Sequence, residues 1–187
     1  MKKTVLTFGL ISGAVISAMM LITVPFHDQI GFDRGVIVGY TSMVLAFLLI
    51  FFGVRSYRDN VAGGALSFGR ALKVGALIGL VSSICYIATW EVVYFNFMPD
   101  YLTKYQAHVL EKARGDGETE AQLAKRQADM EKLGRMYKNP AINVAMTFLE
   151  PLPVALIVTL VSAGVLSRRR KDDEAEVGVA SGARVLT

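Results

Sequence analysis

Two carboxylates interrupt otherwise apolar parts of this sequence and are its first candidates for chemistry. Glu91 and Glu150 each stand near one end of a long run that carries no other charge. An ionisable side chain within a membrane span is costly, and such residues commonly mark ion or proton pathways. Pro151 and Pro153 follow Glu150, and each proline removes a helix hydrogen bond. The pattern makes Glu91 and Glu150, beside a helix break at the two prolines, a candidate ion or proton site.

The depth of these carboxylates bears on how they could act. Counting about 20 residues of span outward from Lys73, and back from Arg168, puts both glutamates roughly 5 Å inside the outer boundary of the hydrocarbon. His27 and Asp28 fall on the same side, so an acidic external vestibule is one interpretation. The other is that acids this shallow extend into water and that the prolines only redirect the helix. Both interpretations stay open at the level of sequence.

Catalytic and metal-binding patterns are otherwise missing from the sequence. It contains two histidines, His27 and His108, and one cysteine, Cys85, which is too few for a cysteine cage, a paired-histidine site or an intrachain disulfide. No nucleophile elbow and no phosphate-binding loop is present. We therefore expect no enzymatic activity, no cofactor and no metal.

The elements that must position these residues are membrane spans. Of the 187 residues, 53% are hydrophobic, the mean hydropathy is +0.43, and the charges gather at the edges of the apolar runs. Four runs approach the roughly 20 residues that cross a bilayer. The sequence predicts an all-α integral membrane four-helix bundle with spans at about 4–26, 35–54, 74–98 and 141–167, and a disordered cytoplasmic tail at 172–187.

Lysine and arginine predict how the bundle is oriented. They flank the spans at 2–3, 55–73 and 168–171, whereas the short loop 27–34 carries only Arg34. This bias favours a multi-pass membrane protein with both termini in the cytoplasm. The positive residues are not interleaved with stacking aromatics on a soluble face, so the expected partner is the lipid bilayer and not a nucleic acid.

Residues 99–139 predict an external helical hairpin between spans three and four. Helical spacing continues over 101–109 as an extension of span three, a Gly-rich tip follows, and Thr119 to Gln122 fits a capping box. Asn139 and Pro140 predict a new helix start. Four apolar residues then share one face: Leu123, Met130, Leu133 and Tyr137. This stripe is either a candidate partner face or the contact between the two helices of the hairpin.

Small residues predict where the spans approach each other. Gly9 and Gly13 lie four residues apart in span one, as do Gly75 and Gly79 in span three. Such stripes permit close helix packing, so we expect the stripes of spans one and three to pack on each other within the chain, with homodimerisation through such a stripe as the alternative. Span two contains the bulky run 47–52 and is expected to face lipid over most of its surface.

Three segments together resemble a known family. They are 67–75 at the entry to span three, 137–140 at the entry to span four, and 147–154 ahead of the terminal basic cluster. In combination they resemble the bacterial membrane protein family called domain of unknown function 4199, over about residues 1–171. The resemblance implies a four-span protein of the bacterial inner (plasma) membrane with a charged helical insertion between spans three and four and no established activity. Glu150 falls within a matching segment.

Two functions remain open on this reasoning. The first is a non-enzymatic membrane module whose external helical hairpin packs on or docks a partner, either a second copy or a periplasmic or membrane protein. The second is a small ion- or proton-coupled transporter that uses Glu91 and Glu150. The hairpin is the most strongly patterned feature, and it favours the first.

Overall fold

The computed structural model describes residues 1–167, and every regular element in that range is a helix. Four helical stretches are long and apolar enough to cross a membrane: Lys2–Ile30, Phe32–Asn60, Phe68–Asn96 and Pro140–Leu166. The predicted all-α, four-span membrane fold is therefore confirmed. The tail predicted at 172–187 lies outside the described residues.

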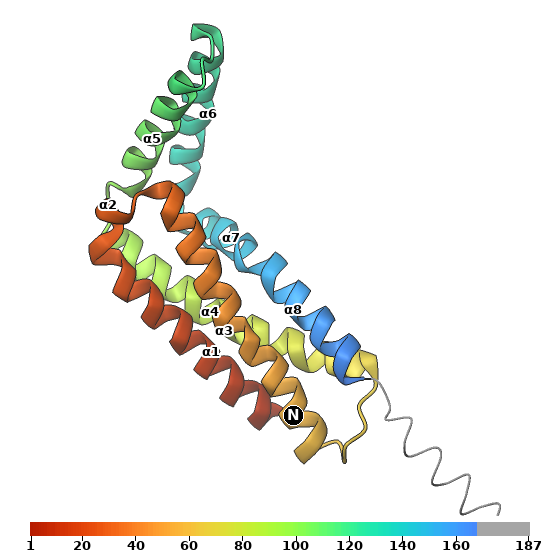
Figure 1. The fold of residues 1–187 in the computed structure, drawn as a ribbon. Helices are drawn as coiled ribbons and strands as arrows, with labels where there is room; N and C mark the ends of the chain where they lie inside the picture. Colours follow the sequence, from red (N-terminus) through yellow and green to blue (C-terminus); the bar gives the residue numbers. More distant parts are fainter. Residues whose placement is uncertain (168–187) are drawn as a thin grey trace, which may run out of the picture.

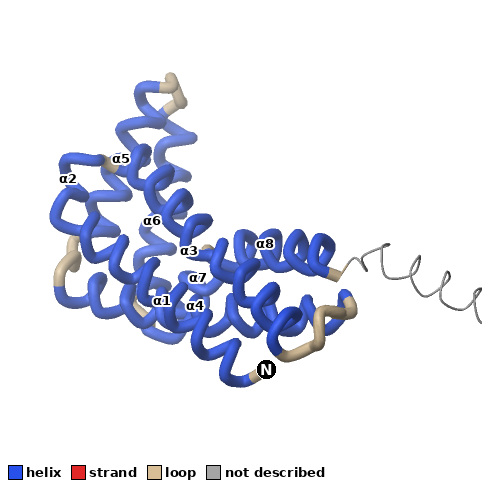
Figure 2. The backbone as a smooth tube through the Cα atoms, turned by 60° about the horizontal axis from the view of Figure 1, so that its bottom comes forward, coloured by secondary structure: helices blue, strands red, loops and turns tan. Residues whose placement is uncertain are grey.

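The helices follow one another with short connections (Figures 1 and 2). The first span continues from α1 through a 3-10 turn, η1, into α2, and the fourth is divided into α7 and α8. The N-terminus and the end of α8 lie at the end of the bundle away from the hairpin of α5 and α6 (Figure 1). The bounds are α1 Lys2–Thr23, η1 Val24–Phe26, α2 His27–Ile30, α3 Phe32–Asn60, α4 Phe68–Asn96, α5 Tyr101–Gly115, α6 Glu120–Tyr137, α7 Pro140–Leu149 and α8 Pro151–Leu166.

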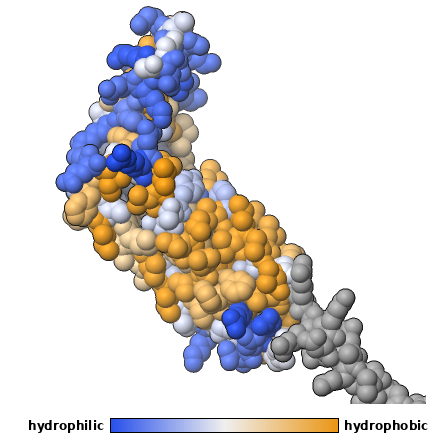
Figure 3. All heavy atoms as spheres, viewed as in Figure 1, coloured by the Kyte–Doolittle hydropathy of each residue, from blue (hydrophilic) through white to orange (hydrophobic). Residues whose placement is uncertain are grey.

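The surface of the bundle is an apolar band between two hydrophilic regions. Figure 3 shows hydrophobic residues covering the bundle, the hydrophilic hairpin at one end and a second hydrophilic cluster at the other. Large apolar side chains on the outside include Ile22, Ile37, Ile84 and Ile157, each more than half exposed. An exposed surface of this composition is typical of helices that face lipid.

Helix α1 approaches α4 closely because it carries glycines at the contact. A Cβ added to Gly9 would lie 2.7 Å from the Cβ of Val81, and one added to Gly13 would lie 2.6 Å from the Cβ of Cys85. Both distances are shorter than carbon atoms tolerate, so only glycine allows this separation of the two helices. The glycine stripe of span one thus packs on span three, as the spacing indicated.

The glycine stripe of α4 packs elsewhere. A Cβ on Gly75 would meet the Thr159 side chain at 2.8 Å, and one on Gly79 would meet the Cβ of Ala155 at 3.3 Å, and both of these neighbours belong to α8. The expectation that the two stripes pack on each other is therefore wrong. Gly75 and Val81 are six residues apart, which at about 100° per residue places them on different faces of α4. Helix α4 uses one face for α1 and another for α8.

Helix α3 contributes one face to the core and exposes the other. Met43, Phe47, Ile50 and Val54 are almost fully buried, and they recur at helical spacing. Most of the remaining surface of α3 is exposed, as expected for a lipid-facing span. Ser12 of α1 adds a polar contact: its hydroxyl donates to the Ala46 carbonyl at 2.8 Å and lies 2.9 Å from the Ser82 hydroxyl. Both serines are fully buried, so these bonds join α1, α3 and α4 inside the bundle.

The hairpin begins with a break in the chain direction. Helix α4 ends at Asn96 and α5 begins at Tyr101, and α5 turns away from the axis of α4 (Figure 1). The expected continuation of span three through residues 101–109 is therefore wrong. Pro99 lies in the connection, where it removes one backbone donor and disfavours helical geometry in the residue before it.

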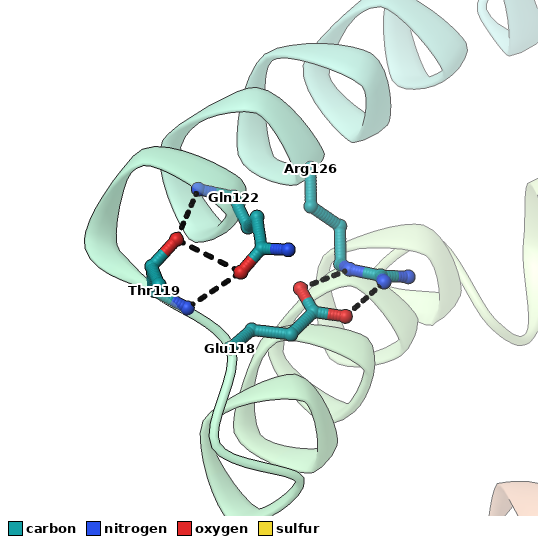
Figure 4. A network of polar contacts seen from close by, with 4 residues as sticks. All are labelled: Glu118, Thr119, Gln122 and Arg126. Atoms are coloured by element: carbon teal, nitrogen blue, oxygen red, sulfur yellow. Dashed lines mark hydrogen bonds and ion pairs between the residues drawn. The ribbon is translucent and has the colours of Figure 1, made fainter.

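The tip of the hairpin and the start of α7 are capped as predicted. The Thr119 hydroxyl accepts from the Gln122 N–H at 3.4 Å, while the Gln122 side chain accepts from the Thr119 N–H at 2.8 Å. Glu118 and Arg126 form an ion pair beside this capping box (Figure 4). At the base of α6, the Asn139 side chain accepts from the N–H of Ala141 at 3.0 Å. The capping box and the N-cap are confirmed.

Candidate functional site

A cavity of about 200 Å³ opens at the hairpin end of the bundle. Residues of α1, α2, α3 and α4 line it together with the first two turns of α5, and the carboxylate-bearing residue Glu150 reaches it from the junction of α7 and α8. Its walls are mainly apolar and aromatic. Six rings among the lining residues are Phe32, Tyr40, Tyr86, Trp90, Tyr101 and Tyr105.

Glu150 is positioned by the helix break that the prolines produce. Helix α7 ends one residue before Glu150 and α8 begins one residue after it, at Pro151, while Pro153 lies within the first turn of α8. The carbonyl of Thr147 is not left free, because it accepts from the Glu150 N–H at 3.3 Å. The break turns the Glu150 side chain toward α4, where the Tyr86 hydroxyl donates to its Oε2 at 2.8 Å.

The Glu150 carboxylate stands at the rim of the cavity. Glu150 is an exposed residue, while its partner Tyr86 is buried. Among the described residues the Tyr86 hydroxyl is the single hydrogen-bond donor to this carboxylate, and it engages one of the two oxygens. A rim carboxylate with one oxygen committed can still accept a hydrogen bond from a molecule that enters the cavity.

Glu91 does not share this site. It is half-buried on α4, it does not line the cavity, and its Oε1 is buried without a hydrogen-bond partner among the described residues. No hydrogen bond joins it to Glu150 within the part of the chain that the structure describes. Trp90, the neighbour of Glu91 in sequence, lines the cavity instead. The two carboxylates, for which counting along the sequence predicts a similar depth, thus have different surroundings.

Aromatic rings from three parts of the chain form one cluster around the cavity. The ring centroids of Trp90 and Tyr101 are 5.2 Å apart at 82°, and those of Phe32 and Tyr101 are 5.7 Å apart. Tyr105 stacks parallel to Tyr101 with centroids 6.4 Å apart, and the His27 ring lies 5.4 Å from that of Tyr101. Burial raises the pKa of Tyr101 to about 12, with the nearby Glu150 charge acting in the same direction.

Two nitrogen atoms in this cluster have unused hydrogen-bonding capacity. The indole Nε1 of Trp90 and the Nδ1 of His27 are buried without hydrogen-bond partners among residues 1–167. The nearest carboxylate oxygen to His27 Nδ1 belongs to Asp28 and is 3.8 Å away, which is too long for a hydrogen bond. An indole N–H can only donate. The lining of the cavity thus includes a residue with an unused donor, Trp90, and a residue with a free acceptor oxygen, Glu150.

Ion pairs brace α5 against the start of α3 and against α2. Lys104 Nζ lies 3.1 Å from Asp28 Oδ1, and Lys112 Nζ lies 3.0 Å from Asp33 Oδ1, which His108 also approaches at 3.5 Å. The hydrogen bond from each lysine holds the pKa of its aspartate below the ordinary value. Asp28 is thus a partner of the hairpin, and it does not line the cavity.

The apolar stripe of α6 lies within the hairpin. Leu123 is buried, as is Ala113 of α5, and Met130, Leu133 and Tyr137 are half-buried. Gln106 of α5 donates to the Met130 carbonyl at 2.8 Å. The Tyr137 ring lies 5.8 Å from the ring of Tyr94 in α4. The stripe contacts α5 and the bundle, and the outward faces of α6 are charged.

The sequence allowed an external vestibule with Glu150 and His27, which both line the cavity, but the aromatic walls of the cavity were missed. Tyr86 and Trp90 are four residues apart on α4, and Tyr101 and Tyr105 are four apart on α5, so each pair shares a helix face. The four-residue spacing indicates an aromatic face on each helix, but it does not show that the face of α4 meets the face of α5. Among residues 1–167 no three His, Cys, Asp or Glu side chains are grouped as metal ligands.

One comparison with known proteins identifies related sequences. A family model described as Protein of unknown function (DUF4199) matches residues 7–168, which is most of the chain, and this confirms the resemblance found in the sequence. No curated protein and no solved structure matches.

Proposed function

Because the chain belongs to the DUF4199 family, whose description names no activity, we propose a function from its own geometry. The protein acts as a non-enzymatic membrane module whose external helical hairpin packs on the bundle and closes the mouth of a ligand cavity. It resides in the bacterial inner membrane with both termini in the cytoplasm, so that the hairpin and cavity face outward.

One observation carries this proposal: α5 forms a wall of the cavity, and it is also the helix of the hairpin that ion pairs connect to the bundle. Tyr101 and Tyr105 line the cavity, and Lys104 and Lys112 on the same helix are paired with aspartates near the ends of α2 and α3. Movement of the hairpin would therefore change the cavity, and occupation of the cavity would change how the hairpin is held.

The coupling can be tested through Trp90, the single tryptophan of the chain. Asp33→Lys places like charges opposite Lys112 and should release α5, so that acrylamide quenches Trp90 fluorescence more strongly. Adding Lys112→Asp should restore protection by reversing the pair. The matched control is Asp59→Lys, which breaks contacts with Arg55 and Arg58 within α3 at the opposite end. Equal quenching in all variants would contradict the proposal.

The orientation has an independent test. Alkaline phosphatase folds to its active form outside the cytoplasm, so a fusion after Gly117 should be active and one after Lys171 inactive. This follows from the lysines and arginines that flank the spans away from the hairpin. The reverse pattern of activities would place the cavity on the cytoplasmic side.

A docked partner remains part of the proposal, as a second copy or a periplasmic or membrane protein. Since the stripe of α6 is engaged within the hairpin, the partner would contact the charged outer faces, where the Glu118–Arg126 pair orders the tip. Photocrosslinkers at exposed Lys125 and Asp129 should then capture one defined species from intact cells. If neither position gives a crosslink while the hairpin stays protease-resistant, no partner docks on these faces.

Ion or proton transport is a second candidate, supported by the Glu150 carboxylate at a cavity rim beside a helix break. It predicts that Glu150→Gln abolishes a cation- or proton-linked flux in liposomes and that Glu91→Gln acts similarly. A flux that is equal in liposomes with wild-type protein, with both variants and without protein would rule transport out and leave the binding module.

A further inference from the structure

We propose that the cavity binds an organic ammonium group that carries a hydrogen-bond-accepting oxygen nearby, as in ethanolamine- or choline-type zwitterionic headgroups. The inference rests on the proposed function, since it names the ligand of the same cavity. Three properties of the walls support it: one rim carboxylate among aromatic rings, a buried donor without a partner, and an apolar remainder.

The first property selects a cation. Glu150 is the one carboxylate in the lining, no lysine or arginine of the described residues lines the cavity, and the lining includes the aromatic rings of Phe32, Trp90, Tyr101 and Tyr105. An ammonium group within about 6 Å of an aromatic centroid is attracted by the negative face of the ring. Aromatic rings with a single carboxylate are poor ligands for a hard metal ion, which requires several oxygens. A large, weakly hydrated organic ammonium matches this wall.

The second property selects an oxygen acceptor close to the cation. The Nε1–H of Trp90 can only donate and lacks a partner among the described residues, and an unpaired buried donor is unfavourable. The His27 ring, with its Nδ1 also unpaired, lies in the same aromatic cluster. A ligand with a phosphate, ester or hydroxyl oxygen beside its ammonium would satisfy both ends of the site.

The third property concerns size and access. The volume of about 200 Å³ exceeds the roughly 150 Å³ that accommodates one benzene molecule, so a headgroup fits and a whole lipid does not. Ile16, Met19, Met20 and Val36 supply apolar walls, and Val36 is also exposed on the outside of the bundle. Glu150 is exposed at the rim. A lipid could therefore insert its headgroup while its chains remain in the membrane, and a soluble amine could enter from the water side.

The experiment titrates the full chain in phosphatidylglycerol nanodiscs and follows Trp90 fluorescence. The probes are short-chain phosphatidylethanolamine, its N-acetyl derivative, which lacks the positive charge, and soluble phosphoethanolamine. Phosphatidylethanolamine should give a saturable change with a half-point at least about tenfold lower than that of the N-acetyl form, because a hydrogen bond to a charged group is removed. Soluble phosphoethanolamine acting as well as the lipid would identify a water-soluble ligand of the same class.

Glu150→Gln should raise the half-point for phosphatidylethanolamine about tenfold while leaving that for the N-acetyl form unchanged. The amide oxygen can still accept from Tyr86, so the fold should persist, which circular dichroism and gel filtration would verify. Glu91→Gln is the matched control, a carboxylate of similar depth outside the cavity, and should have no effect. Trp90→Phe removes the Nε1–H donor and should weaken binding of phosphatidylethanolamine. Because this variant lacks the tryptophan signal, its binding is followed with a fluorescent lipid probe.

Two failures are distinguishable. If the charged and N-acetyl lipids bind equally and Glu150→Gln changes neither, the ammonium assignment is wrong, while binding to the cavity stands. If no probe alters Trp90 fluorescence and the hairpin variant Asp33→Lys leaves quenching unchanged, both the ligand class and the proposed function are wrong.

Discussion

The bundle and the hairpin are built from the same kind of helix and held together by different forces. Between α1 and α4 the close contact depends on glycines, which have no side chain: a Cβ at Gly13 would lie 2.6 Å from that of Cys85. Between α5 and the bundle the contact combines aromatic rings, such as Tyr101 on Trp90, with exposed ion pairs, such as Lys104 to Asp28 at 3.1 Å. Lipid tails are as apolar as the helix surfaces, so the hydrophobic effect does not drive helices together within the membrane. Close van der Waals packing has to stabilise the bundle instead.

The difference assigns roles to the two regions. The attraction between closely packed helices is short-ranged. Moving two packed surfaces apart by about 1 Å already loses much of that attraction, so the bundle tolerates little movement. Exposed ion pairs are weak individually and are screened by salt, so the hairpin is the part that can move. The cavity lies at the junction, with one wall from each region, which is where a movable wall could respond to a ligand.

The largest effect should come from filling the helix contact in the bundle. Gly13→Leu puts a side chain where Cys85 already lies, and it should destabilise the folded bundle by at least the roughly 3 kcal/mol of severe overpacking. The matched control is Gly164→Leu in α8, where an added Cβ meets nothing within 4 Å. Steric-trapping or denaturant titration in micelles would measure both. Equal stability of the two variants would contradict the packing account.

The next effect should remain confined to the hairpin. Changing Leu123, Met130 and Tyr137 to Asp places three charges along the contact of α6 with α5 and the bundle, at a cost of about 2–3 kcal/mol for the loss of Leu123 burial alone. The hairpin should become protease-sensitive while membrane insertion is retained. Asp at the exposed positions Ala121 and Ala128 should be tolerated. A hairpin that stays resistant after the triple change would rule out both packing and docking through the stripe.

A smaller effect should follow from loss of the cap at the tip. Thr119→Ala removes the hydroxyl that accepts from the Gln122 N–H and should destabilise the start of α6 by about 1 kcal/mol. Hydrogen exchange should rise in the first turn of α6 and not in α4. Thr103→Ala, an exposed change within α5, is the control. An unchanged exchange rate at the tip would mean that the Glu118–Arg126 pair orders it without the cap.

The sequence predicted local features better than long-range ones. The capping box at Thr119 and the N-cap at Asn139 depend on residues two or three positions apart, and both were read correctly. The four spans depend on composition alone, since every backbone group in lipid must be satisfied within a helix. The turn between α4 and α5 was missed because the helical spacing of apolar residues continues past Pro99, although the backbone does not.

The cavity could not have been read from the sequence for a related reason. Its walls combine Tyr86 with Glu150, 64 positions apart, and bring Phe32 against Tyr101. Core-facing and lipid-facing residues are equally apolar in a membrane protein, so periodicity does not reveal which faces meet. The glutamates illustrate this limit: counting residues gave them the same depth, but only the rotation of each helix decides that Glu150 reaches the cavity and Glu91 does not.

The smallest effect should come from titrating the ion pairs that hold α5. The lysine hydrogen bonds lower the folded-state pKa of Asp28 and Asp33 below the unfolded value near 3.8. A lowered carboxyl pKa contributes stability that is present above the unfolded value and is lost as the pH falls through the folded one. Acrylamide quenching of Trp90 should therefore stay constant from pH 7 to about 5 and rise below about 4.

Salt and a neutralised variant separate these pairs from other titrating groups. At 1 M salt the screening length is about 3 Å, so quenching at pH 7 should already approach its acidic level. Asp28→Asn combined with Asp33→Asn should show raised quenching at pH 7 and a weaker rise in acid, while His27 and His108 remain in place beside the altered residues. If the double variant keeps both the low quenching at pH 7 and the full acid response, the ion pairs do not hold α5. Its aromatic contacts with Phe32 and Trp90 would then be sufficient to close the cavity.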